Sequence, residues 1–334
     1  MTEYLKIIDN TLIYAPDLTV LDFEISPHDN SDIHTIVLPD KLENFSDFIC
    51  HKCEALTSLQ ISKDNPNFVS VDGVIFSKDL TTLYYYPPGK TENTYIIPST
   101  VTKIGDNAFA NCKHLKTMEI PDNVTTIGNG SFSYSSICSI VIPDSVTYMG
   151  ESALSLCENL ISIKLPKYMK SISSFLCAWN DKLTTVVIPE GVTEIGDSAF
   201  SGCTSLKNIN IPNTVKTIGF LAFEECEALT KIVIPDSVTE IEDSAFDGCV
   251  SLEFIELGDG ISTIKMCTFK NCCNLKRLYF GKNIFHIAFD AFEGVDLKKI
   301  KIKHIDNEYI SGWAKENGVR ALNSEIEIFL DALT

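Results

Sequence analysis

The stretch Leu183–Leu206 reads LTTVVIPEGVTEIGDSAFSGCTSL, and the same order of residue types recurs along most of the 334-residue chain. Its Ile-Pro pair recurs at 97–98, 120–121, 142–143, 211–212 and 234–235. Leu-Pro takes its place at 38–39 and 165–166, and Leu-Gly and Phe-Gly at 257–258 and 280–281. From residue 98 onward, neighbouring pairs are 22 or 23 residues apart. We therefore predict about ten repeats of 23 residues between residues 39 and 302.

Each repeat carries apolar residues in fixed columns. In LKTMEIP, at 115–121, Met118 and Ile120 alternate with polar residues, which predicts a short strand with these two side chains inward. Proline ends the strand, and a Gly-Asp pair such as 196–197 starts a short helical turn. A column of mostly aromatic residues follows: Phe109, Phe132, Leu154, Phe175, Phe200, Phe223, Phe246, Phe269 and Phe292.

A single repeat is too small to bury these columns, whereas a stack of repeats buries them in one continuous core. The expected fold is therefore an α/β repeat solenoid with a parallel sheet along one side. The pattern LTxIxIPxxVTxIGxxAFxxCxxL at 183–206 resembles the BspA-like leucine-rich-repeat family, over about residues 39–302. The resemblance implies a curved, right-handed leucine-rich-repeat stack. The sheet would line its concave face, with short helical turns or loops on the convex side. It also implies a role in protein or surface recognition and no catalytic residues.

Three segments depart from the repeat. Residues 1–38 and 303–334 are predicted to be N-terminal and C-terminal caps, because a solenoid must cover its apolar ends. In the C-terminal cap, Ile310–Leu322 has helical spacing, EIEIFL at 325–330 predicts a closing strand, and Trp313 is expected to pack. Residues 62–97 are predicted to form an inserted β-hairpin module. Its tyrosines at 84–86 either pack the insert onto its neighbours, which we favour, or form a binding surface.

Charge and apolar content restrict the partners and the location. A net charge of -18 argues against binding of nucleic acid or an anionic membrane. No run of about 18 apolar residues predicts a membrane span. The first ten residues, MTEYLKIIDN, do not form a secretory signal. We expect a cytoplasmic protein if Met1 is the native start, and otherwise a secreted or cell-surface protein.

Twelve cysteines raise the question of disulfides, metal ligands or buried thiols. Cys203, Cys226, Cys249 and Cys272 lie 23 residues apart, which favours buried thiols at one turn of each repeat. Cys50-His51-Lys52-Cys53 has the spacing of a zinc or redox pair. However, the same two cysteines already occupy repeat positions, and no second pair completes a zinc site. We therefore predict no cofactor and no metal, and keep a metal or redox protein that uses Cys50, His51 and Cys53 as a remote alternative.

Phosphate loops, dinucleotide fingerprints and metalloprotease motifs are missing from the sequence, so we predict no enzymatic activity. The outward positions of the predicted strands become basic and aromatic toward the C-terminal end: Lys231, Phe254, Arg277, Tyr279, Lys299 and Lys301. We predict that these residues bind an unidentified protein, acidic where it docks, and the alternative is a solvated charged surface. The leading function is a non-catalytic scaffold for protein–protein interaction. The alternative is a secreted or cell-surface adhesin for host proteins or glycans.

Overall fold

The structure is a computed structural model that describes residues 5–21, 31–46, 50, 53–304 and 307–322. The predicted closing strand at 325–330 lies outside the described residues, and so do His51 and Lys52. The chain divides into two compact units, Met1–Leu160 and Ile161–Thr334, which are described separately below.

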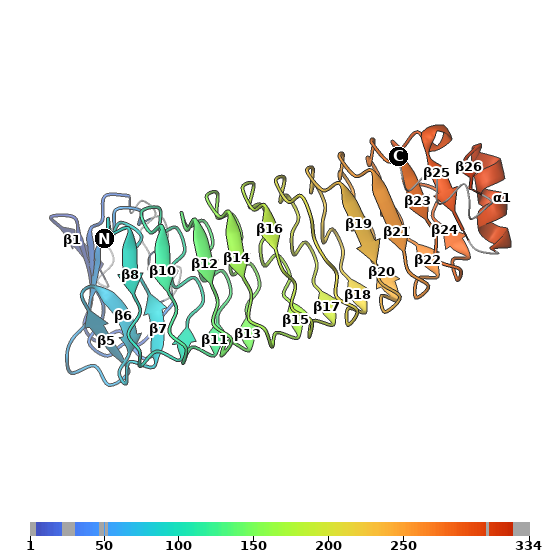
Figure 1. The fold of residues 1–334 in the computed structure, drawn as a ribbon. Helices are drawn as coiled ribbons and strands as arrows, with labels where there is room; N and C mark the ends of the chain where they lie inside the picture. Colours follow the sequence, from blue (N-terminus) through green and yellow to red (C-terminus); the bar gives the residue numbers. More distant parts are fainter. Residues whose placement is uncertain (1–4, 22–30, 47–49, 51–52, 305–306, 323–334) are drawn as a thin grey trace. The chain divides into compact units, whose positions relative to one another are not determined.

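A four-stranded sheet begins the first unit, in the order β1-β2-β3-β4 (Figure 1). β1 (Leu5–Ile8) and β2 (Thr11–Tyr14) form an antiparallel hairpin. β3 (Thr35–Val37) pairs parallel with β2 and with β4 (Ser58–Gln60). The central residues Leu12, Ile36 and Leu59 are fully buried, so the stacking of apolar columns already starts in this sheet.

An antiparallel insert follows. β5 (Phe68–Val71) and β6 (Val74–Ser77) are joined by Asp72 and Gly73, both at positive φ, and β6 also pairs antiparallel with β7 (Thr82–Tyr85). The Tyr84 ring lies 5.3 Å from Phe68 and 6.0 Å from Phe45, while Tyr85 and Tyr86 are buried. These tyrosines therefore pack the insert onto its neighbours.

The rest of the first unit is a stack of turns of the chain, here called coils. Each coil contributes a long strand: β8 (Thr94–Ile96), β10 (Thr117–Glu119) and β12 (Ser139–Val141). Each also contributes a strand of two residues: β9 (Lys103–Ile104), β11 (Thr126–Ile127) and β13 (Tyr148–Met149). β8 pairs parallel with β10, and β7, β9, β11 and β13 form a second parallel ladder.

The second unit repeats this arrangement. Its long strands are β14 (Ser162–Lys164), β16 (Thr185–Val186), β19 (Lys231–Ile234), β21 (Phe254–Leu257), β23 (Arg277–Tyr279), β25 (Lys301–Lys303) and β26 (Arg320–Ala321). Its short strands are β15 (Ser171–Ile172), β17 (Glu194–Ile195), β18 (Thr217–Ile218), β20 (Glu240–Ile241), β22 (Thr263–Ile264) and β24 (His286–Ile287). Between β16 and β19 only a single bridge, Thr185 to Asn208, continues the long ladder.

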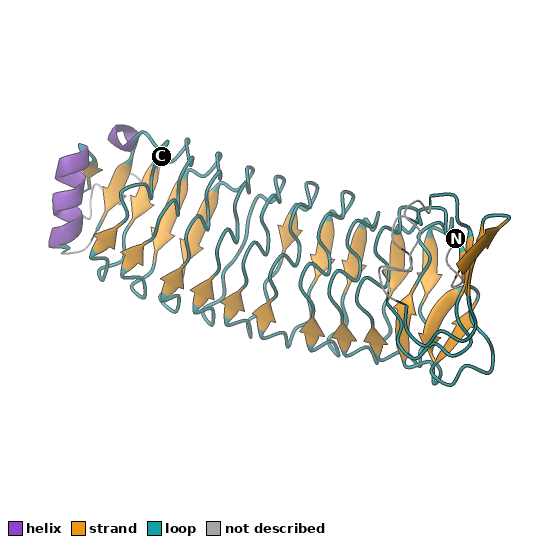
Figure 2. Cartoon of the chain, turned by 180° about the vertical axis from the view of Figure 1, so that it is seen from behind, coloured by secondary structure: helices purple, strands orange, loops and turns teal. Residues whose placement is uncertain are grey.

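Each unit is thus a β-solenoid of stacked coils with parallel strands. The sequence predicted one sheet, whereas both units carry a second ladder of two-residue strands (Figure 2). Strands this short show no alternation that a pattern search detects. Within the described residues the only α-helix is α1 (Glu308–Asn317), and the segments between the short strands and the cysteines are turns.

Stacked phenylalanines fill the second unit. The ring centroids of Phe200 and Phe223 are 5.4 Å apart, those of Phe223 and Phe246 5.2 Å, and those of Phe246 and Phe269 5.5 Å. The rings are nearly parallel, with interplanar angles of 7° to 12°, and all four are fully buried. Parallel pairing aligns equivalent residues at each coil, which is why identical side chains stack on one another.

The expected place of Phe175 in this column was wrong. Cys177 fills the position instead: its N–H donates to the carbonyl of Ala199, as the N–H of Phe200 donates to Ala222. Phe175 occupies a turn position with φ 57° and stacks on Trp179, 6.1 Å away. A strict step of 23 residues back from Phe200 leads to Cys177, so the aromatic side chain of Phe175 gave a false register.

The end of the second unit is covered by α1. Asn307 accepts a hydrogen bond from the N–H of Ile310, and Gly318 ends the helix in the left-handed conformation, as expected for helix caps. Trp313 lies 5.7 Å from Phe280 and 5.7 Å from Phe292, so it closes the apolar stack. Among the described residues, no helix has both the length and the apolar character to cross a bilayer.

Candidate partner-binding surface

Four long strands of the second unit place the predicted surface residues. β19, β21, β23 and β25 pair in parallel register, so Lys231, Phe254, Arg277 and Lys301 lie opposite one another in one row. A second row contains Val233, Glu256, Tyr279 and Lys303. The residues between the two rows point into the core and are fully buried: Ile232, Ile255, Leu278 and Ile302. The alternation of a strand therefore turns both rows outward.

Cations in these rows lie over aromatic rings. The Phe254 ring has Lys231 Nζ at 5.0 Å and Arg277 Cζ at 5.6 Å from its centroid. The Tyr279 ring meets Phe254 edge-on at 5.0 Å and has Lys303 Nζ at 5.4 Å. Such cation–π contacts contribute about 0.5–1 kcal/mol each at exposed sites. They hold positive charges in fixed places beside half-buried rings.

We call these residues the basic–aromatic strip: Lys231, Phe254, Arg277, Tyr279, Lys301 and Lys303. Five of them were predicted from the sequence, and Lys303 was missed.

Lys299 was placed wrongly on this sheet. Residues 297–299 form a 3-10 helix before β25, and Lys299 Nζ pairs with the carboxylate of Asp296 at 2.9 Å. Arg277 therefore aligns with Lys301, a step of 24 residues, and Tyr279 aligns with Lys303. The additional residue before β25 moves Lys299 off the strand and brings Lys303 into the second row. An uneven step at this coil was the signal that would have found Lys303.

A cavity of about 390 Å³ runs along the ends of the same strands. Its lining includes Asn210, Asn213, Glu256, Tyr279 and Lys303. It also includes Gly258 and Gly281, which replace the prolines of earlier repeats. The groove offers amide, carboxylate and ammonium groups beside one aromatic ring. It therefore extends the strip with hydrogen-bonding groups.

The repeated cysteines belong to the core. The Sγ of Cys203, Cys226 and Cys249 donates to the carbonyl oxygens of Cys177, Phe200 and Phe223, at 3.1, 3.3 and 3.2 Å. Burial raises the pKa of the Cys203 thiol to about 12, so the thiol stays protonated at neutral pH. All twelve cysteines are free in this structure. The thiols therefore satisfy backbone carbonyls at one turn of each coil.

The Cys50–Cys53 segment is described only in part. Cys50 and Cys53 are both buried, and burial raises the pKa of the Cys53 thiol to about 12. A raised pKa opposes the thiolate form that both zinc binding and disulfide exchange use. In the described part of the chain, no three His, Cys, Asp or Glu side chains gather as metal ligands.

Thiol reactivity gives a direct test of this burial. At pH 8 we expect 5,5′-dithiobis(2-nitrobenzoic acid) to react rapidly with one thiol of the native protein, because Cys273 alone is exposed. The buried thiols have raised pKa values and lack access, so they should react only after unfolding in guanidinium, when twelve thiols are counted. Cys273→Ser should remove the rapid phase. Rapid reaction of several thiols in that variant would contradict the buried assignment.

Comparison with known proteins follows the same repeat. A family model described as BspA type leucine rich repeat region (6 copies) matches residues 80–207 and 193–317. Among solved structures, the chain is similar to a leucine-rich repeat protein from Eubacterium ventriosum ATCC 27560, with 28% identity and a TM-score of 0.43. That match covers 78% of this chain and 59% of the other, so the chain spans little more than half of that protein.

Two further solved structures are similar. The T. pallidum leucine rich repeat protein has 24% identity and a TM-score of 0.48, covering 54% of this chain and 86% of that one. A leucine rich cell surface protein from Faecalibacterium prausnitzii A2-165 has 21% identity and a TM-score of 0.42, covering 98% and 95%. A search of curated proteins gives no match.

Proposed function

Because the chain belongs to the BspA-type leucine-rich-repeat family, we propose that it is a non-catalytic scaffold that binds another protein through its solenoid surface. The basic–aromatic strip receives an acidic segment of that protein. In this proposal the coils of each unit wind right-handed, with the long strands on a concave face and the turns on a convex side. Residues 1–38 and 303–334 cap the solenoid of residues 39–302, which carries the insert at 62–97.

The observation that carries the proposal is the pairing of cations with aromatic rings in the strip. Arg277 and Lys231 share the Phe254 ring, and Lys303 lies over Tyr279. The whole chain has a net charge of -18, so this local excess of positive charge stands out. Aromatic residues and arginine are enriched at the energetic centres of protein interfaces. Complementary charge would speed encounter with an acidic partner and select it over others.

A labelled oligo-glutamate peptide tests the charge preference of the strip. We expect Lys231→Glu, Arg277→Glu, Lys301→Glu and Lys303→Glu, combined in one variant, to weaken peptide binding at least tenfold, because four attractive contacts become repulsive. The measurement is fluorescence anisotropy at low and high salt. For the wild type, affinity should fall as salt increases.

The matched control reverses three lysines of the same unit that lie outside the strip. Lys270, Lys276 and Lys282 are each paired with a carboxylate, Glu293, Glu253 and Asp259. Their reversal to glutamate makes a similar change in net charge and should alter peptide affinity less than threefold. Equal weakening in both variants would mean that net charge, rather than the strip, governs binding.

A second candidate function is an adhesin, secreted or at the cell surface, that binds a glycan. The groove favours it, because Asn210, Asn213 and Glu256 offer hydrogen bonds to hydroxyl groups beside the Tyr279 ring. A glycan array separates the two candidates. Binding that Tyr279→Ala and Asn210→Ala abolish, with oligo-glutamate binding retained, would favour the adhesin.

A further inference from the structure

A different column of residues follows each short strand, at the first turn of the coil. In several coils this position holds a polar residue: Asp106, Asn129, Asp197 and Asp243. In three coils of the second unit it holds a large apolar residue: Phe220, Met266 and Phe289. We call Asp197, Phe220, Asp243, Met266 and Phe289 the turn column. Its composition thus changes from capping residues to apolar side chains within one stack.

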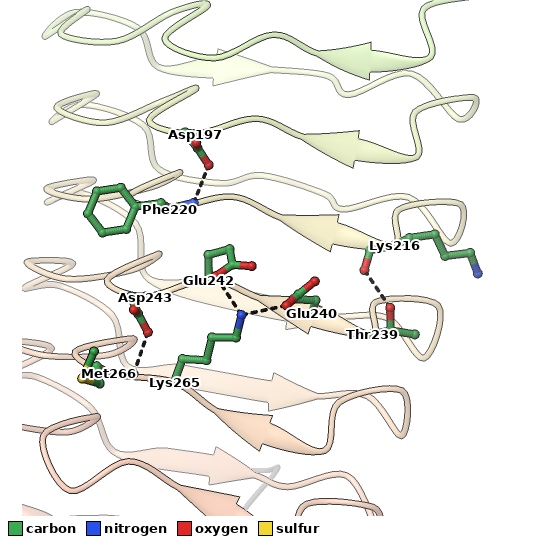
Figure 3. A network of polar contacts seen from close by, with 9 residues as sticks. All are labelled: Asp197, Lys216, Phe220, Thr239, Glu240, Glu242, Asp243, Lys265 and Met266. Atoms are coloured by element: carbon green, nitrogen blue, oxygen red, sulfur yellow. Dashed lines mark hydrogen bonds and ion pairs between the residues drawn. The ribbon is translucent and has the colours of Figure 1, made fainter.

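Hydrogen bonds fix the backbone of this column. The Asp197 carboxylate accepts from the N–H of Phe220 at 2.8 Å, and the Asp243 carboxylate accepts from the N–H of Met266 at 3.0 Å (Figure 3). The carbonyl oxygens of Phe220 and Met266 accept from the N–H of Ser198 and Ser244, at 2.7 and 2.9 Å. The apolar side chains therefore project from an ordered backbone that is bonded to the neighbouring coil.

These three side chains are exposed to solvent although apolar residues fill the core beneath them. The exposed fraction is 46% for Phe220, 51% for Met266 and 96% for Phe289. Single exposed apolar residues are common on protein surfaces, but three in one column form a connected stripe. Coils stack at about 4.8 Å, so the column from Phe220 to Phe289 spans about 14 Å. That length equals roughly ten residues of an α-helix.

The surroundings of the column are acidic. The four turns that carry it hold eight carboxylates: Glu224, Glu225, Glu227, Glu242, Asp243, Asp247, Asp290 and Glu293. They hold two lysines, and both are in ion pairs. Lys265 Nζ lies 2.7 Å from both Glu240 and Glu242 (Figure 3), and Lys270 Nζ lies 2.8 Å from Glu293.

The carboxylates also influence one another. Burial raises the pKa of Glu224, and the negative charges of Glu225 and Asp247 raise it further. Burial likewise raises the pKa of Asp247, and the charge of Glu293 adds to the increase. A nearby cation would relieve this repulsion, so the surface around the column is electrostatically suited to a positively charged ligand.

We propose that the turn column binds a cationic amphipathic segment of another protein. The apolar side chains of that segment cover Phe220, Met266 and Phe289, and its lysine and arginine residues face the surrounding carboxylates. The charge preference is opposite to that of the basic–aromatic strip, so the two surfaces of the second unit select different partners. This inference does not depend on the function proposed for the strip.

The test uses a labelled lysine–leucine amphipathic helical peptide of about 14 residues, with fluorescence anisotropy as the readout. We expect the wild type to bind it, and the triple variant Phe220→Asn, Met266→Asn and Phe289→Asn to bind at least tenfold more weakly. Asparagine occupies the equivalent position at Asn129, so the variant should keep its circular dichroism spectrum and melting midpoint. The matched control is Phe285→Asn. Phe285 is 64% exposed and belongs to the column of Lys216 and Thr239, at the other end of the short strands (Figure 3).

A second triple variant separates apolar contact from charge. Replacing Phe220, Met266 and Phe289 with aspartate adds three negative charges, so attraction by charge alone would strengthen peptide binding, whereas the proposal expects weakening. Charge reversal of the strip should leave this peptide bound. The proposal is overturned if the asparagine variant binds as the wild type does, or if Phe285→Asn weakens binding equally. It is also overturned if the wild type ignores the peptide and instead self-associates in sedimentation velocity through the turn column.

Discussion

Replacing Phe223 with alanine is expected to lower the free energy of unfolding by about 3–5 kcal/mol, the usual cost of removing a fully buried aromatic ring. Phe223 is fully buried, and its ring stacks on Phe200 at 5.4 Å and on Phe246 at 5.2 Å. Alanine would leave a cavity in the middle of the column and remove ring contacts to both neighbouring coils. Urea denaturation followed by circular dichroism measures the loss.

Phe220→Ala is the matched control, three residues earlier in the same coil. Its ring is 46% exposed, so we expect the free energy of unfolding to change by less than about 1 kcal/mol. Similar losses for both variants would mean that the stacked rings are not the main source of stability. Because repeat arrays depart from two-state unfolding, the comparison should use transition midpoints and amplitudes as well as fitted free energies.

Gly281→Ala is expected to cost about 1–3 kcal/mol, as overpacking commonly does. A Cβ atom at this position would collide with the carbonyl oxygen of Gly258 and lie 3.1 Å from the Cα of Asp259. The backbone of the coil before it is too close to yield without moving the strand end. Thermal denaturation should show a lower midpoint. Because Gly281 lines the groove beside Tyr279, the same variant should also reduce ligand binding there.

Gly312→Ala provides the opposite sign. Gly312 lies within α1, and a Cβ atom there would meet no atom within 4 Å. Alanine has the higher helix propensity, so we expect stabilisation of up to about 1 kcal/mol. If both substitutions moved the melting midpoint in the same direction, the close approach at Gly281 would not be the cause of its effect.

The spacing of Ile-Pro pairs was enough to predict a stack of coils with parallel strands, because each coil repeats the same apolar positions. The second ladder was not predicted, since strands of two residues, such as Glu194–Ile195, leave no periodic signal. Phe175 was placed by residue type, although the hydrogen bonds of the coil place Cys177 in that position. Residue identity therefore gave less reliable registers than constant spacing.

The strip was predictable where spacing stayed constant and failed where it changed. Arg277 and Tyr279 follow Phe254 at the regular step, but the 3-10 helix at 297–299 shifted the last coil and exchanged Lys299 for Lys303. The turn column was not recognised from the sequence. Its exposure depends on the sharp turn after it, where Ser198, Leu221 and Ser244 adopt left-handed backbone angles between 51° and 57°. Nothing in their residue types predicts that conformation.

The regular backbone bonding between coils has a consequence for inheritance. The N–H of Thr193 donates to Lys170, that of Lys216 to Thr193, and that of Thr239 to Lys216, at 2.8 to 2.9 Å. Each coil therefore presents the next one with the same donors and acceptors that it receives. An unequal crossover that duplicates or deletes the codons of one whole coil would create a junction chemically equivalent to the existing ones. Such a gene could change the number of coils, and with it the spacing between its binding surfaces, without requiring compensating mutations elsewhere.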